Sequence, residues 1–571
     1  MIIVFFVWVV LFVLFVATGN VINGKLLNRH SGIFYNFILG FITLSAISSL
    51  WSFWFPSNKY LLFLIVSVVY KSIFNESFRI FNRFKSINFF DYVFLTIVGF
   101  YFITSVINVS SVFDTFLYHN PIISFLGKHK LIPGLSNLHG RFGFNNLTYS
   151  LCAIVTLEDR LPYYLLNGLL VFVVIIYLYF SIKKNKKIVD KIVYLNVMFW
   201  LFWYVSGWLS SPDSLLVSFI VFFTVKFMQN NFQMESSDLI LVVFLPMIKL
   251  SAILFSFFFS IVCFIQTAKQ KTDLKISLLF SGILIIVCIA RSFILTGQIA
   301  YPIQKPYLSV VDFSISKTKI VDEIVGVQGW ARFPGNEYSV NHAKYPNVEQ
   351  WLPLVMNNKF NEKYTRLPFI GSISKKIVLF FLVGFFLFSI IFFIKKNNFN
   401  YSIYPILYFI SFLFVFLQAP NWSWFEPYLT LGLLMLLFVI GNWLAKIVLI
   451  LFSFLVVPYQ GKRLLEIGVE SVSSSYKKDI VLFPENIGDR FDRKPIRSVI
   501  DTMEGVTDLH TIYTRLDTIR GLKPDVFFTY RYSYLSNGLC PKTDEICVPC
   551  KLRNNIRFTG SSFKDIDVFN K

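Results

Sequence analysis

Charged residues are scarce in this sequence. Only 15% of its 571 residues are Asp, Glu, Lys or Arg, whereas 55% are hydrophobic. Soluble globular domains carry about 25% charged residues, so this composition excludes an ordinary soluble protein and indicates that lipid is the main solvent. Acidic residues are rarer than basic ones: the sequence has 32 Asp and Glu and 53 Lys and Arg, so the formal net charge is +21.

Several common chemical motifs are also missing. The chain contains no P-loop, no dinucleotide-binding fingerprint and no nucleophile elbow, so nothing in it encodes coupling to nucleotide hydrolysis. Of its few cysteines, Cys540, Cys547 and Cys550 cluster near the C-terminus. A lone C-x-x-C is half of a zinc site, so we predict no metal there and expect one disulfide among these three thiols, with the pairing left open.

Basic residues gather in short clusters beside apolar runs. Arg79 to Lys85, Lys183 to Lys191, Lys269 to Lys275 and Lys395 to Lys396 are examples. This is the positive-inside pattern of membrane proteins, which favours membrane lipid over nucleic acid as the partner of the positive charge.

Apolar segments of membrane-spanning length recur along the first 457 residues. A spanning helix needs about 20 mostly apolar residues. Candidates lie near 2–18, 33–55, 60–74, 90–108, 161–181, 190–209, 214–229, 238–266, 276–295, 377–394, 403–418 and 428–457. The runs 238–266 and 428–457 carry polar residues in their middle and are predicted to fold as hairpins. The sequence therefore predicts an all-α polytopic protein with about 12–14 transmembrane helices.

The basic clusters also predict which segments face outward. With the clusters in the cytoplasm, residues 109–160, 210–213, 296–376 and 419–427 become outer loops, within which 144–160 is expected to be an interfacial or re-entrant helix. Residues 458–571 are polar with short β-prone runs, and we expect a small extracytoplasmic α/β or α+β appendage after the membrane domain 1–457.

Polar residues that carry chemistry concentrate in the first outer loop. Asp114 follows a membrane helix directly, and the same loop supplies aromatic, imidazole, amide and guanidinium side chains, namely Tyr118, His119, Asn137, His139, Arg141 and Asn145. A general base, hydrogen-bond donors and an anion clamp at the bilayer surface would suit a lipid-linked phosphate substrate.

Three further candidates lie at or within the membrane. Asp213, in the outer turn 210–213, is expected on the same face as Asp114, where one acid would accept a proton and the other would hold a divalent cation or orient the acceptor. Lys249 and Arg291 fall inside predicted spans, where an uncompensated cation is costly, so both should point into the protein or its outer cavity.

Several sequence motifs resemble those of an uncharacterised family of bacterial polytopic membrane proteins that is similar to the GT-C glycosyltransferases. The resemblance is carried by DTFLYH (114–119), PGLSNLHGRFGFN (133–145), SSPD (210–213), IKLSA (248–252), ARSFILTGQIAYP (290–302), WARFP (330–334) and CVPC (547–550). It covers almost the whole chain.

The resemblance implies a GT-C-like fold and transfer of a sugar from a polyprenyl-phosphate donor to a cell-envelope glycan, lipid or protein, at the periplasmic face of the inner membrane. Asp114 looks like the catalytic carboxylate of that family. From the residues alone, Asp213 is a second catalytic candidate, and Arg141, Arg291 and Arg332 are expected to bind substrate. Two departures are visible. Asp114 follows the fourth predicted helix rather than the first, and the turn 419–427 has Asn421 where an acid is expected.

Two other functions stay open. A repeat-unit polymerase or O-antigen ligase would use the same carrier with basic residues, and His139, Arg141 and Arg332 would then matter most. A secondary transporter or lipid flippase would line its path with Lys249 and Arg291.

Overall fold

The computed structural model describes most of the membrane domain. The described residues are 1–26, 32–84, 87–107, 118–137, 140–157, 161–162, 164–269, 271–311, 313–333, 338–356, 399–420, 422–440, 556–558 and 566–568. Of the expected C-terminal appendage, only two short antiparallel strands fall within this set, β1 (Ile556–Phe558) and β2 (Ile566–Val568).

The described chain up to residue 440 is helical. In order, its helices are α1 (Ile2–Val21), η1 (Ile22–Leu26), α2 (Ile33–Trp51), α3 (Lys59–Phe84), α4 (Phe89–Ile107), α5 (Asn120–Lys128), η3 (Leu135–Asn137), η4 (Gly140–Gly143), α6 (Thr148–Val155), α7 (Leu165–Lys184), α8 (Ile188–Trp208), α9 (Pro212–Gln229), α10 (Asp238–Ile248), η5 (Leu250–Ala252), α11 (Ile253–Thr267), α12 (Lys271–Thr296), α13 (Lys317–Arg332), α14 (Tyr338–Lys344), α15 (Val348–Met356), α17 (Phe399–Gln418) and α18 (Trp422–Ile440).

The protein is a multi-pass membrane protein. Among the described residues, eight helices are long and apolar enough to cross a bilayer, and α10 and most of α17 are shorter apolar helices. Large apolar side chains point outward on α3, where Phe63 is 75% and Phe74 is 77% exposed. Contact of this apolar surface with lipid tails costs no free energy, whereas its exposure to water would be unfavourable.

The run 238–266 forms the hairpin that its sequence predicts. Pro246 lies near the end of α10, and the chain leaves the helix at Lys249, whose backbone is extended. After the short turn η5, α11 packs back against α10. The break leaves Lys249 at the tip of this hairpin.

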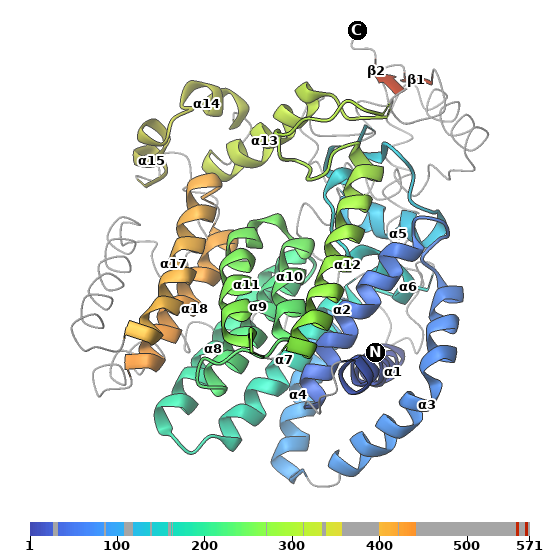
Figure 1. Cartoon of the computed structure of the whole chain (residues 1–571), viewed down its shortest axis with the longest axis vertical. Helices are drawn as coiled ribbons and strands as arrows, with labels where there is room; N and C mark the ends of the chain where they lie inside the picture. The colour runs from blue at the N-terminus through green and yellow to red at the C-terminus, as the bar shows by residue number, and fades with distance from the viewer. Residues whose placement is uncertain are drawn as a thin grey trace, which may run out of the picture.

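Segments predicted to be outer loops build a cap at one end of the bundle. Figure 1 shows α13, α14 and α15 beyond the ends of α12 and α17, opposite the turns that join α3 to α4 and α7 to α8. Helix α6 is only eight residues long, and all of them are buried, in contact with α2 and α5. The sequence predicts an interfacial or re-entrant helix in 144–160. Because α6 packs inside the protein, it does not lie along the membrane surface, and the re-entrant alternative stays a prediction.

Close backbone contact joins the first two membrane helices. A Cβ placed on Gly40 of α2 would lie 1.8 Å from the carbonyl oxygen of Phe15 in α1, so only glycine fits there. Small residues allow this approach, which gives packing energy where lipid offers no hydrophobic driving force.

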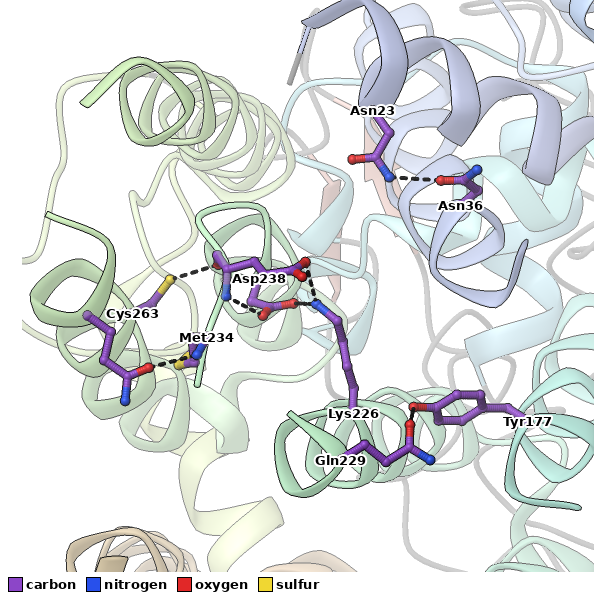
Figure 2. A network of polar contacts seen from close by, with 10 residues as sticks. Asn23, Asn36, Tyr177, Lys226, Gln229, Met234, Asp238 and Cys263 are labelled. Carbon is purple, nitrogen blue, oxygen red and sulfur yellow. Dashed lines mark hydrogen bonds and ion pairs between the residues drawn. The ribbon is translucent and has the colours of Figure 1, made fainter. Parts of the chain in front are cut away.

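A partly buried polar network joins the end of α9 to the start of α10 (Figure 2). Lys226, near the end of α9, donates to Glu235 Oε2 at 3.0 Å and to Asp238 Oδ1 at 2.6 Å, and its ammonium lies 4.1 Å from the ring centre of Tyr35. The backbone N–H of Met234 donates to Gln266 at 2.7 Å. These bonds hold the turn between α9 and α10, and so fix where the hairpin starts.

We expect Lys226→Met to destabilise the protein by about 3–5 kcal/mol, because the nearly buried Asp238 carboxylate would lose its cation. Thermal unfolding in detergent measures the loss. Lys184→Met, at an exposed position in the last turn of α7, is the matched control and should leave the unfolding temperature unchanged. Equal stability of the two variants would contradict a structural role for the network.

Candidate functional site

An ion pair joins the start of α9 to the tip of the α10–α11 hairpin. Ser211 caps α9 by accepting a hydrogen bond from the backbone N–H of Asp213 at 3.2 Å, with Pro212 at the first helical position. Asp213 Oδ1 accepts from Lys249 Nζ, and Ser211 Oγ donates to Asp213 Oδ2 at 3.1 Å. The carboxylate is nearly buried, while the lysine side chain keeps 26% of its surface exposed. The cation therefore has an acid partner and an open side.

Lys249 also contacts an aromatic ring from the end of the described membrane domain. Its ammonium lies 4.4 Å from the ring centre of Trp424, in the first turn of α18. Segments that are remote in sequence thus meet around one lysine. An acid, a cation and an indole face are groups that can bind the hydroxyls, the phosphate and the ring of a sugar phosphate.

His119 lies close to this lysine. The imidazole is buried, and its Nδ1 shares a hydrogen bond with the hydroxyl of Tyr149 in α6. Burial lowers the pKa of His119 well below its ordinary value, and the positive charges of Lys249 and Arg141 lower it further. The ring is therefore neutral at pH 7, and it can share a proton with Tyr149 without adding positive charge.

Arg141 connects the first outer loop to the second. Its Nε donates to Glu323 of α13 at 3.1 Å, and its guanidinium lies 5.4 Å from the ring centre of Tyr118. Tyr301 packs nearby against Phe144, with ring centres 6.0 Å apart. No feature of the sequence indicates Glu323 as the partner of Arg141, because the two residues lie 182 positions apart. The pair brings the two large outer loops together beside His119.

Arg291 is fully buried in α12. Its Nη1 donates to Ser150 Oγ at 3.0 Å and to Ser52 Oγ at 3.5 Å, while Nε and Nη2 have no hydrogen-bond partner. Among the described residues no carboxylate pairs with it. Both Arg291 and Lys249 point into the protein, as the cost of a lipid-facing cation predicts.

The two predicted amides hold the cap together. Asn137 donates to the carbonyl oxygen of Phe313 at 2.8 Å, and Asn145 donates to the carbonyl oxygen of Cys288 at 2.6 Å. Both bonds tie the first outer loop to α12 or to the loop that follows it. Asn145 Oδ1 is buried without a partner, which leaves one acceptor for a ligand.

A further carboxylate, in α18, was not among the residues predicted from the sequence. Glu426, one turn into α18, is buried, and its Oε1 accepts from Trp200 Nε1 and from Thr430 Oγ1 at 2.9 Å. Its Oε2 has no hydrogen-bond partner. The only sequence signal was an acid one turn after Trp422 at the start of a membrane helix.

Arg332 lies apart from this group, at the end of α13, where it contacts α14, α15 and the end of α17. Asp114 and His139 fall outside the described residues, as do Cys540, Cys547 and Cys550. Among the described residues, no group of three or more His, Cys, Asp and Glu side chains is placed to hold a metal ion. Asp213, Lys249, His119, Tyr118 and Arg141 are thus the predicted residues that the structure gathers at one end of the bundle.

The chain belongs to the family described as "Domain of unknown function (DUF8201)", whose profile matches residues 1–430. That range holds the Asp213–Lys249 pair and every other side chain described above for the site. No curated protein and no solved structure matches the chain.

Proposed function

We propose that this protein transfers a sugar from a polyprenyl-phosphate donor to a cell-envelope acceptor at the outer face of the bacterial inner membrane. The observation that supports it most is the Asp213–Lys249 ion pair against the ring of Trp424, with His119 near enough to feel the charges of both Lys249 and Arg141. Acid, cation and aromatic face lie together where a membrane helix begins, and a lipid-linked donor presents its sugar and phosphate at that depth. The positive-inside pattern supports the outer assignment.

The reaction that these groups would serve is a displacement at the anomeric carbon. The acceptor hydroxyl attacks that carbon, its proton passes to a carboxylate, and the bond from the sugar to the phosphate oxygen breaks. The electron pair of the broken bond stays on the phosphate, which a nearby cation must stabilise. Asp114 is our candidate for the base, from its place just beyond a membrane helix.

Lys249 is our candidate for the cation. A phosphate that enters beside Trp424 would compete with Asp213 for the ammonium group. As Lys249 turns to the phosphate, Asp213 is left free to accept a hydrogen bond from the acceptor hydroxyl and to orient it. With a lysine already beside this carboxylate, the orienting role fits Asp213 better than divalent-cation binding does.

The experiment measures transfer or hydrolysis by the full-length protein in liposomes, with polyprenyl phosphates that carry a tritiated hexose or pentose. We expect the wild type to consume at least one donor, and Asp213→Asn to reduce kcat about 10–100-fold because the acceptor is less well oriented. Asp190→Asn, at the inner end of α8, is the matched control and should retain full activity. No consumption of any donor by the wild type would contradict the proposal.

A double variant separates catalysis from folding. Asp213→Asn leaves Lys249 without its acid partner, which by itself costs stability. In Asp213→Asn/Lys249→Gln both charges are gone, so thermal stability should return toward the wild type while transfer stays low. Recovery of transfer together with stability would show that the pair is only structural.

A further inference from the structure

Arg332 ends α13 inside the cap rather than on its surface. Only 7% of the surface of this residue is exposed, and its guanidinium lies 4.8 Å from the ring centre of Trp351 in α15. Nη2 donates to the carbonyl oxygen of Gln418 at 3.2 Å, and Nη1 lies 3.4 Å from His342 Nδ1. No carboxylate among the described residues pairs with this cation.

Two donors in this cluster have no partner. Arg332 Nε and the indole Nε1 of Trp351 are both buried without a hydrogen bond, and Trp351 is completely inaccessible. Buried donors are rarely left without a hydrogen bond in a folded protein, because they have lost their bonds to water and formed no others. The guanidinium lies over the Trp351 ring, so one anion with several oxygens can accept from both N–H groups.

The surroundings fix the place and charge of the expected ligand. Arg332 bonds to Gln418, the last residue of α17, so the guanidinium lies at the end of an apolar helix. Burial and the charge of Arg332 lower the pKa of His342, which keeps the imidazole neutral at pH 7. Arg332 is thus the one positive charge among the described groups of this cluster.

We propose that Arg332, Trp351 and His342 form a second anion site, which binds a phosphate group at the outer membrane surface. It is separate from the Asp213–Lys249 pair and does not depend on sugar transfer. Arginine recognises phosphate through planar, charge-assisted bonds, and the indole N–H adds a donor from another direction. The phosphate could belong to a lipid or be free in solution.

The test is binding of defined probes to the full-length protein in detergent, followed by native mass spectrometry. The probes are a C20 prenyl phosphate, the corresponding prenyl alcohol, a phosphatidylglycerol and inorganic phosphate. Arg332→Gln should weaken binding of at least one phosphate probe about 10–100-fold. Trp351→Phe keeps the ring but removes one N–H, and should weaken the same probe about 3–10-fold.

Controls separate this site from the one around Lys249. Trp330→Phe, in the same helix as Arg332 but 42% exposed, should bind like the wild type. The same losses should appear in a Lys249→Gln background, so they do not depend on the proposed transfer site. A lipid preference would appear as tighter binding of the prenyl phosphate or phosphatidylglycerol than of inorganic phosphate, and the reverse order would indicate a site for free phosphate.

The proposal is overturned if both Arg332→Gln and Trp351→Phe bind every phosphate probe as tightly as the wild type. Equal binding of prenyl alcohol and prenyl phosphate would overturn it too. If Arg332→Gln fails to fold, Trp351→Phe decides alone, since it keeps the aromatic packing with Phe416 and Arg332.

Discussion

Turnover of a polyprenyl-phosphate sugar should fall about 10²–10⁴-fold in Asp114→Asn, while expression and donor binding stay largely intact. The asparagine keeps the size of the side chain but cannot take the proton of the acceptor hydroxyl. A loss of this size is usual when a general base is removed. Initial rates in liposomes, measured over a range of donor concentrations, separate kcat from KM.

Arg141→Ala is the matched comparison and should act on donor binding. It removes a cation beside His119 and also breaks the ion pair with Glu323, so KM should rise more than kcat falls. Glu323→Gln tests the second effect alone. Undiminished transfer by Asp114→Asn would reject Asp114 as the base, and would favour a polymerase-type mechanism that depends on His139 and the arginines.

The parts of the fold that the sequence predicts well are those with a local cause. The hairpin at 238–266 follows from Pro246 and Lys249 inside an apolar run, since a proline breaks the helix and a cation resists the bilayer centre. Burial of Arg291 follows from the same cost. The position of helix α6 was harder to predict, because an apolar stretch of eight residues has the same sequence pattern whether it packs inside the protein or lies at a membrane interface.

The parts of the site that the sequence misses are contacts between remote segments. Asp213 and Lys249 were each predicted as candidates, but nothing in their spacing of 36 residues shows that they pair. Glu323, Trp351 and Glu426 were missed because their importance lies in what they face: Arg141, Arg332 and Trp200 respectively. Asn137 and Asn145 were predicted to bind substrate; the structure shows that their amide nitrogens bond to backbone carbonyls of Phe313 and Cys288, and a part in binding stays a prediction.

Arg291→Met should make the protein more stable and less active at once. The guanidinium is completely buried, two of its nitrogens have no partner, and no described acid offsets its charge. An arginine at the centre of a membrane helix costs about 2.5–3.5 kcal/mol on insertion scales. Methionine has similar length, and its only losses are the bonds to Ser150 and Ser52, so we expect a net gain of about 1–2 kcal/mol.

Such an unpaired cation is maintained at a cost in stability, and stabilisation of the phosphate leaving group of the proposed reaction would account for that cost. Transfer by Arg291→Met should therefore fall at least about 100-fold, the size expected when one charge that stabilises a developing anion is removed. Thermal unfolding in detergent and donor turnover in liposomes are measured on the same preparation. The wild type should also be stabilised by added prenyl phosphate, and the variant much less.

Lys275→Met, at an exposed position of the same helix, should change neither quantity. The two measurements on Arg291→Met distinguish the roles that its burial allows. Lower stability with lower activity would mean that Arg291 supports the packing of α2, α6 and α12 through its two serines. Higher stability with full activity would mean that the cation does not take part in transfer. Only a more stable and slower enzyme fits an arginine that is held in place for the phosphate of the donor.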